Sequence, residues 1–343
     1  MTPRSGRIRP RVGRRGLDLG PLSLGTGSLG GLHHPVSAEV FAETVASALR
    51  LGIRTFDTAP IYGLGVSEQR LGAALRHYPR DALVVSTKIG RLLHDPCSYI
   101  GNAEIDNGYD GAWHGVPPQK IVVDFSYDAT FRSVSESLER LGLDRIDIVY
   151  IHDTFEEHHY RSSMEGAYRA LDKLRREGAI GAIGVGIGHI DKLLRFAADG
   201  DFDCFLVAGR YTLLDHTHAR ELLTACERRN ITIVLGGVFN SGLLADPYCA
   251  APLFDYRPAP PELVARTREL DRICRAHGVP LKAAALQFPL AHPAVATVLL
   301  GAATPSELEE NVRLADLPIS DVLWSDMRTA GLLSSNAVAP VAR

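Results

Sequence analysis

Short apolar runs alternate along the chain with longer stretches in which apolar residues recur at helical spacing. The runs predict strands at 22–26, 53–57, 82–87, 146–151, 179–186, 203–208, 231–236 and 296–300. The longer stretches predict helices at 37–51, 67–77, 129–141, 163–176, 189–198, 216–229, 261–276, 281–290 and 305–315. The strands are apolar on both faces, as buried parallel strands are. This repetition, with no visible domain break, predicts an α/β fold of one domain, a (β/α)8 TIM barrel over residues 11–343.

Five segments fall outside the repeat. Residues 1–10 predict a flexible basic arm, and 11–20 predict an N-terminal β-hairpin around a Gly-Arg-Arg-Gly turn. Two stretches rich in Gly, Pro, Asn and Asp, 91–126 and 239–260, predict long loops at the C-terminal rim of the barrel, where barrel active sites lie. The tail after Pro318 predicts one extra C-terminal helix.

Composition narrows the classes of function. A net charge of -3 gives no sign of a nucleic-acid or membrane surface, and no apolar run approaches the ~20 residues of a membrane span. Arginines crowd the first fifteen residues without a following apolar segment, so we expect no signal peptide. The five cysteines are scattered and never spaced C-x-x-C, which predicts a reducing, cytoplasmic location and no metal site.

Four titratable residues follow three predicted strands of one rim: Asp57, Tyr62, Lys88 and His152. If they meet, Asp57 would hold Lys88 beside the Tyr62 hydroxyl, and the cation would lower the tyrosine pKa from ~10 by about 1–3 units. Such a phenol exchanges a proton with an alcohol or carbonyl oxygen, which His152 would orient. Side chains cannot carry the accompanying hydride, so the arrangement predicts a nicotinamide cofactor.

Each of these residues also has a purely structural interpretation. Asp57 could cap the following loop, Tyr62 could be a packing residue, and Lys88 could be a solvated charge at a strand end. A single histidine such as His152 is more often a satisfied core residue than a catalyst. A single such residue is easily explained by coincidence. Four such groups at strand ends on one rim are much harder to explain in that way.

The motifs around these residues resemble one family. Gly52-Ile-Arg-Thr-Phe-Asp57-Thr-Ala-Pro-Ile-Tyr62-Gly63, Ser86-Thr-Lys88-Ile-Gly90 and Tyr150-Ile-His152-Asp153 resemble the aldo-keto reductases, and the match runs from about Arg11 to Leu314. Further segments are similar to the bacterial aldose 1-dehydrogenases (D-threo-aldose or L-fucose dehydrogenases) and to pyridoxal 4-dehydrogenases. These segments are Asp124–Asp128, Gly209–Asp215, Gly237–Leu243 and Gln287–Pro293.

The resemblance implies a barrel in which Tyr62 is the acid–base, Lys88 and Asp57 tune it, and His152 orients the substrate. It implies an NAD(P)-dependent enzyme that oxidises an aldose of the L-fucose or D-arabinose type at C1. One alternative is an aldo-keto reductase that reduces, or oxidises, an aldehyde or ketone such as pyridoxal or a secondary-metabolite carbonyl. A third is a non-catalytic nucleotide-binding subunit, whose mark would be a lost tetrad. The expected partner is a small-molecule substrate, and the expected state is a monomer or homodimer.

Positions that contact the cofactor in the family carry over to Gly25, Thr26, Asp57, Gly186, Gly237, Phe239, Asn240, Ser241, Gly301, Ala302, Thr304, Glu307, Glu310 and Asn311. Two departures concern the nicotinamide: Gly186-Ile187 stand where many relatives have Ser-Asn, and Gly236 stands where many have a tyrosine. Glu307 favours NAD, with NADP left open, because its carboxylate would repel a 2′-phosphate. Thr304 and Glu307 also have the spacing of a helix capping box.

Candidate substrate contacts lie in the loops after three strands. Trp113 and His114 could line the pocket, or Trp113 could pack within its loop. Arg210 and Tyr211 could contact substrate, although a structural salt bridge is the more frequent role of such an arginine. Gly25–Gly30 matches the dinucleotide pattern G-x-G-x-x-G, but the eightfold alternation argues against the two-layer fold that this pattern requires.

Overall fold

The computed structural model describes residues 9–32, 34–97, 99, 101, 104–108 and 111–340; residues 1–8 of the predicted basic arm lie outside this part. The barrel strands are β1 (Leu22–Gly25), β2 (Thr55–Asp57), β3 (Val84–Ile89), β6 (Ile146–His152), β7 (Ile180–Ile187), β8 (Cys204–Ala208), β9 (Thr232–Gly236) and β12 (Val295–Gly301). They close in the order β1-β12-β9-β8-β7-β6-β3-β2, and the paired neighbours are parallel. The predicted (β/α)8 barrel is therefore confirmed.

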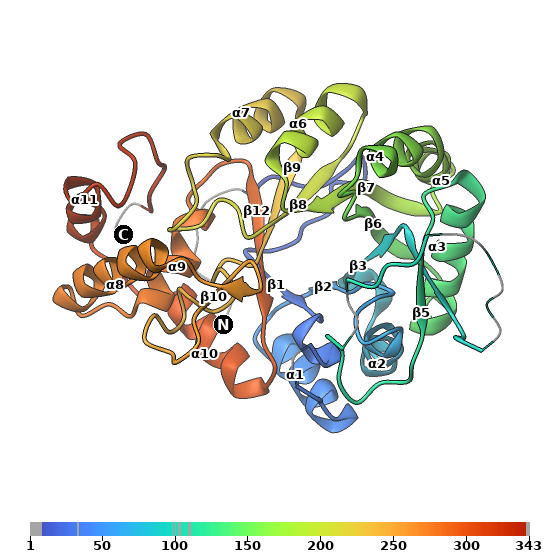
Figure 1. Cartoon of the computed structure of the whole chain (residues 1–343), viewed down its shortest axis with the longest axis horizontal. Helices are drawn as coiled ribbons and strands as arrows, with labels where there is room; N and C mark the ends of the chain where they lie inside the picture. Colours follow the sequence, from blue (N-terminus) through green and yellow to red (C-terminus); the bar gives the residue numbers. More distant parts are fainter. Residues whose placement is uncertain are drawn as a thin grey trace.

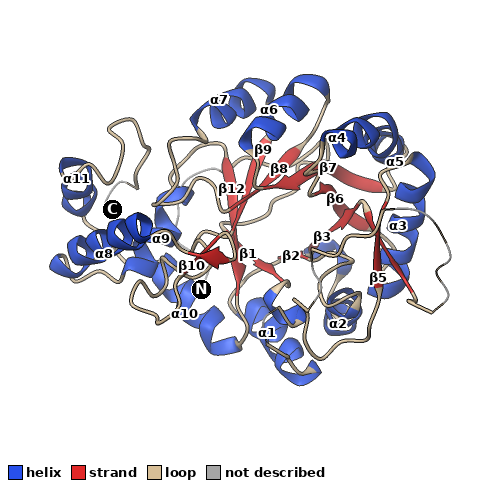
Figure 2. Cartoon of the chain, viewed as in Figure 1, coloured by secondary structure: helices blue, strands red, loops and turns tan. Residues whose placement is uncertain are grey.

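Helices surround this ring of strands (Figures 1 and 2). They are α1 (Ala38–Arg50), α2 (Val66–Leu75), α3 (Tyr127–Leu141), α4 (Glu157–Ser162), α5 (Tyr168–Arg176), α6 (Ile190–Asp199), α7 (Arg220–Arg229), α8 (Pro261–Ala276), α9 (Leu281–Leu290), α10 (Pro305–Ala315) and α11 (Asp321–Thr329). Short 3-10 turns η1 (Ser28–Gly30) and η2 (Arg80–Ala82) precede α1 and β3. Side-chain caps fix several starts: Ser37 accepts from the Val40 amide, and Ser126 accepts from the Ala129 amide. The predicted C-terminal helix is α11, which packs against α8.

The helix after β6 begins earlier than predicted and is interrupted. A π-helical turn, η3 (Ser163–Ala167), joins α4 to α5, whereas the sequence predicts a helix only from 163. Gly166 lies in this turn, and a β-carbon there would approach the Phe125 carbonyl oxygen to 2.5 Å. Glycine is therefore needed where the helix packs against the chain leading into α3.

The N-terminal hairpin closes the bottom of the barrel. The two predicted strands reduce to one antiparallel bridge between Val12 and Leu17. Val12 is buried, as is Leu19 just beyond the hairpin, and both pack with inward-facing side chains of the barrel, namely Val84, Ile148, Tyr150, Ala182, Cys204, Leu206, Val234 and Ala296. A larger apolar cluster lies between the strands and the surrounding helices.

Both long rim segments contain hairpins that the sequence does not predict. β4 (Arg91–His94) pairs with β5 (Lys120–Val123), and Ile105 forms a further bridge to Val122. β10 (Leu253–Phe254) pairs with β11 (Arg257–Pro258).

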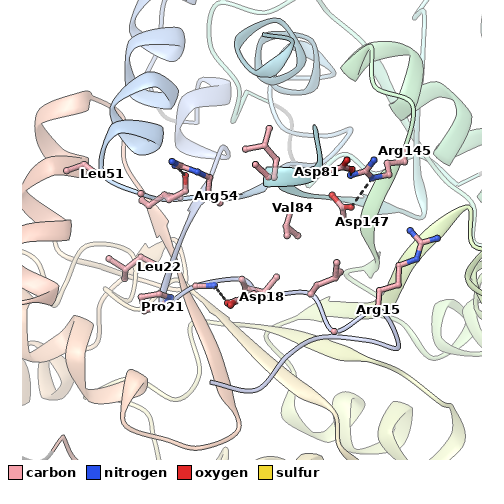
Figure 3. A pocket seen from close by; sticks show the side chains of 18 of the residues that line it. Arg15, Asp18, Pro21, Leu22, Leu51, Arg54, Asp81, Val84, Arg145 and Asp147 are labelled. Carbon is pink, nitrogen blue, oxygen red and sulfur yellow. Dashed lines mark hydrogen bonds and ion pairs between the residues drawn. The ribbon is translucent and has the colours of Figure 1, made fainter. Parts of the chain in front are cut away.

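A pocket of about 690 Å³ opens at the N-terminal end of the barrel (Figure 3). Leu22, Arg54, Val84 and Asp147 line it, each at or just before the start of a strand. The candidate catalytic residues lie at or just beyond the opposite ends of the strands, so this pocket is separate from them. No helix of the described residues has both the length and the apolar character to cross a membrane.

Candidate active site

Asp57 and Lys88 form a buried ion pair at the C-terminal rim. Lys88 Nζ donates to Asp57 Oδ2 at 2.5 Å and to the Thr58 carbonyl oxygen at 2.8 Å. Ser86 Oγ donates to the other carboxylate oxygen at 2.6 Å. Asp57 and Lys88 are 2% and 1% exposed, so each charge is compensated inside the protein rather than by water.

Tyr62 lies against this ion pair. The Lys88 ammonium is 4.7 Å from the centroid of the Tyr62 ring. The Tyr62 ring also meets His152 edge-on, with centroids 6.2 Å apart, and the Trp113 ring at 5.8 Å. The four residues that the sequence singled out therefore converge on one place, although they come from three strand ends.

His152 is the last residue of β6 and is 7% exposed. Burial, together with the nearby cations of Lys88 and Arg91, holds the pKa of His152 well below its usual value. The imidazole is therefore neutral at pH 7. Its Nε2 lies 3.3 Å from Asp153 Oδ2, and its Nδ1 is buried without a hydrogen-bond partner among the described residues.

Arg91 holds the main chain at His152, a role that no sequence signal indicated. Its two terminal nitrogens donate to the carbonyl oxygens of His152 at 2.7 Å and Asp153 at 3.2 Å. Its Nε donates to Asp106 Oδ2 at 2.7 Å. Asp153 has a left-handed backbone, with φ of 49°, and its amide donates to the Gly186 carbonyl oxygen. The hairpin strand β4 is thus fastened to the end of β6.

Two predicted cofactor residues adjoin the tetrad on β1. Gly25 lies in register between Asp57 of β2 and Gly301 of β12. The Thr26 hydroxyl is buried; it donates to the Asp57 carbonyl oxygen at 3.0 Å and accepts from Ser67 Oγ at 2.7 Å. Thr26 therefore supports the position of Asp57 through its side chain. The Gly25–Gly30 segment follows a barrel strand, in agreement with its rejection as a two-layer fingerprint.

The segment after β9 brings backbone and amide groups together. Gly237 has a φ of 64°, and a β-carbon there would approach the Gly209 amide nitrogen to 3.0 Å, so the position requires glycine. Asn240 Nδ2 donates to the Gly209 carbonyl oxygen at 3.0 Å, while its buried Oδ1 has no partner among the described residues. Ser241 Oγ accepts from the Tyr256 amide at 3.0 Å. Phe239 is partly buried beside them.

The end of β12 and the first two turns of α10 carry further predicted cofactor residues. Thr304 Oγ1 accepts from the Glu307 amide at 3.3 Å, and Glu307 Oε2 accepts from the Ala303 amide at 2.9 Å. This is a capping box shifted by one residue, and it leaves a carboxylate directly after β12. Ala302 is buried, and Glu310 is paired with Lys282 at 2.5 Å. Asn311 Oδ1 is buried without a partner in the described part of the chain.

The four candidate substrate residues separate into two groups. Trp113 stacks near Tyr62 and His114 donates its amide to the Gly31 carbonyl oxygen, so this segment reaches the tetrad. Arg210 instead pairs with Asp255 at 2.7 Å, and the Tyr211 ring is buried against Phe288 and His292. Arg210 therefore forms the salt bridge considered as its alternative role, and the Tyr211 ring packs in the core; contact of either residue with substrate stays a prediction.

Comparison with known proteins identifies the family. The profile of the Aldo/keto reductase family matches residues 21–330. Pyridoxal 4-dehydrogenase of Microbacterium luteolum is 40% identical over 94% of this chain and 97% of its own. D-threo-aldose 1-dehydrogenase of a Pseudomonas species is 41% identical over 94% and 98%. The chain belongs to the aldo-keto reductase family. Its fold is also that of the holo form of an aldo-keto reductase from Bacillus halodurans, with a TM-score of 0.72, 22% identity and 98% of each chain covered.

As an aldo-keto reductase, the chain is an NAD(P)-dependent oxidoreductase. The rim residues fit such a cofactor. Gly237 leaves the backbone accessible, α10 presents a helix N-terminus that suits an anion, and the amide oxygens of Asn240 and Asn311 are buried without protein partners in the described residues. These are the groups that we expect to hold a dinucleotide.

Proposed function

We propose that this aldo-keto reductase is an NAD-preferring dehydrogenase that oxidises the anomeric carbon of an aldose of the L-fucose or D-arabinose type to a lactone. The observation that carries the proposal is the convergence of Lys88, Asp57 and His152 on Tyr62. The similarity to D-threo-aldose 1-dehydrogenase over nearly the whole of both chains supports the substrate class.

In this proposal Tyr62 takes the proton from the reacting hydroxyl. The Lys88 ammonium stabilises the phenolate form, because Asp57 and the Thr58 carbonyl hold it against the ring. His152 is neutral; in this proposal its Nε2 carries the proton and donates a hydrogen bond to the substrate oxygen in place of Asp153, which fixes the direction of that oxygen. The bound nicotinamide supplies the hydride chemistry.

The preference for NAD is supported by the charge at the start of α10. The Glu307 carboxylate accepts from the Ala303 amide, and so it stays beside the end of β12. A 2′-phosphate at this edge would meet a like charge, whereas NAD would place hydroxyls there. A neighbouring cation, Lys282, already pairs with Glu310. Cytoplasmic location and a monomeric or homodimeric state stay predictions.

A second candidate function is oxidation of pyridoxal or a related carbonyl compound. Pyridoxal 4-dehydrogenase is 40% identical over 94% of the chain, which favours this substrate as strongly as the sugar. The same four residues serve either substrate, since both reactions remove a proton from a hydroxyl on the reacting carbon; for pyridoxal this is the hydroxyl of its cyclic hemiacetal. The walls formed by the rim hairpins would decide between them.

A substrate screen combined with one variant tests the proposal. Reduction of NAD and NADP is followed with L-fucose, D-arabinose, L-galactose and pyridoxal, and kcat/KM is compared. Tyr62→Phe should keep NADH affinity within about twofold, measured by fluorescence, and lower kcat by roughly 10²–10⁴. A variant with near-normal kcat would remove Tyr62 from the proton transfer. A wild-type enzyme that prefers pyridoxal would select the second candidate instead.

A further inference from the structure

Two consecutive histidines of α4 converge on one carboxylate from the rim segment after β4. His158 Nε2 lies 3.0 Å from Glu104 Oε2, and His159 Nε2 lies 2.9 Å from the same oxygen. Adjacent side chains on a helix usually diverge, because successive residues turn by about 100°. Here the two ring centroids are 4.2 Å apart, and the three ligand atoms lie within 4.8 Å of one another.

We propose that Glu104, His158 and His159 form a binding site for a divalent transition-metal ion such as Zn²⁺, which fastens the segment 104–108 to α4. Two imidazoles and one carboxylate are a ligand set that suits Zn²⁺, Co²⁺ and Ni²⁺ rather than Mg²⁺ or Ca²⁺. Water would complete the coordination, because three protein ligands leave at least one position open.

Metal binding would require a small opening between the Glu104 oxygen and each of the two imidazole nitrogens. Ligand atoms about 2.1 Å from a tetrahedral zinc lie about 3.4 Å from one another. The two nitrogen–oxygen separations, 3.0 and 2.9 Å, would have to widen by a few tenths of an ångström. His158 is 67% exposed and Glu104 is 47% exposed, so both side chains can make this adjustment and an ion can enter from solvent.

His159 is the preorganised member of the group. Its side chain is 7% exposed and its ring packs against Phe125. The Glu156 amide donates to His159 Nδ1 at 3.4 Å, whereas metal binding at Nε2 requires the tautomer with a proton on Nδ1. A contact this long opposes that tautomer only weakly. Glu104 is held from the other side, because its carbonyl oxygen accepts from the Val123 amide of β5.

The expectation of no metal site rested on cysteine spacing, which cannot detect this group. Glu104 stands 54 residues before His158, and an isolated His-His pair is not a metal motif. The bridge from Ile105 to Val122 and the ion pair of Asp106 with Arg91 follow directly after Glu104. An ion at Glu104 would therefore restrain the segment that leads to the main chain of His152.

Calorimetric titration of the full-length, tag-free, EDTA-treated protein with ZnCl₂ tests the site. We expect one ion per chain and a rise in Tm on saturation; His158→Ala and Glu104→Gln should weaken binding at least tenfold. Bound Co²⁺ should show visible d–d absorption that His158→Ala removes. His277→Ala is the matched control, because His277 also pairs with a carboxylate, Asp326, but has no second histidine beside it; it should bind Zn²⁺ as the wild type does.

Two results would overturn the proposal. One is a wild-type affinity for Zn²⁺ that is no greater than that of His158→Ala. The three residues would then form hydrogen bonds only. The other is equal weakening in His277→Ala, which would mean scattered surface binding. Since His158 is largely exposed, its variant keeps the test valid even if His159→Ala fails to fold.

Discussion

Lys88→Met should damage the enzyme in two separable ways. The substitution removes the ammonium and leaves the Asp57 carboxylate, 2% exposed, with the Ser86 hydroxyl still donating to it. Removing one member of a buried ion pair costs about 3–5 kcal/mol in the free energy of unfolding. An unfolding entropy of about 2.1 cal/mol/K per residue over 343 residues is about 0.7 kcal/mol/K, so Tm should fall by about 4–7 °C.

The double variant Asp57→Asn/Lys88→Met separates stability from catalysis. Both charges are gone, and the asparagine introduced at position 57 keeps an oxygen for the Ser86 hydroxyl. Thermal unfolding should therefore return to within about 1–2 °C of the wild type, a coupling free energy of at least about 2 kcal/mol between the two sites. Turnover should not return, because the charge that stabilises the Tyr62 phenolate is gone; kcat should stay roughly 10²–10⁴ below wild type in both variants.

The assays are differential scanning fluorimetry and steady-state NAD reduction at one pH, with Asp57→Asn as the second single variant. A double variant no more stable than Lys88→Met alone would show that the pair is not electrostatically coupled. Normal kcat in Lys88→Met would show that the ammonium does not act on Tyr62.

Three further predictions concern the surroundings of the tetrad. Glu307→Gln should raise the NADP-to-NAD ratio of kcat/KM roughly two- to fivefold, the scale of one exposed charge, and an unchanged ratio would remove Glu307 from cofactor choice. Arg91→Met should lower kcat/KM roughly 10- to 100-fold, because the main chain at His152 loses its hydrogen bonds to the guanidinium. Arg91→Lys should recover little of this activity, because an ammonium cannot form the same paired hydrogen bonds. Normal activity in either variant would contradict this role of Arg91. The pKa of His152 is lower in the folded than in the unfolded state, so its contribution to stability is present above about pH 6.5 and declines as pH falls below it. In urea unfolding His152→Gln should therefore lose less stability than the wild type between pH 7 and pH 5, and parallel curves would contradict a buried neutral imidazole.

The sequence predicted those features that depend on local pattern. Parallel strands put their carboxyl ends on one rim, so Asp57, Lys88 and His152 could be placed together from their positions after apolar runs. The capping role of Thr304 and Glu307 could be predicted from the sequence, because their partners lie within one helical turn.

Features that depend on contacts distant in sequence were missed. The β4–β5 hairpin pairs Arg91 with Val123 across a segment rich in turn formers, and neither strand is long enough to show a period of its own. No sequence signal pointed to Arg91, because its partners lie at the end of β6 and in the segment 104–108. Tyr211 follows β8, but its ring packs in the core, and its backbone is left-handed with a φ of 66°.

The anchoring of β4 by Arg91 has a consequence for how this scaffold can diversify. The guanidinium grips carbonyl oxygens, and every amino acid presents the same carbonyl, so the attachment does not depend on which residues stand at 152 and 153. The stretch between β4 and β5 can then vary in length and chemistry around Asp106, whose side chain binds Arg91, while its root stays fixed. Substrate range could therefore shift across descendants of this protein through that stretch alone, while the residues that transfer the proton stay the same.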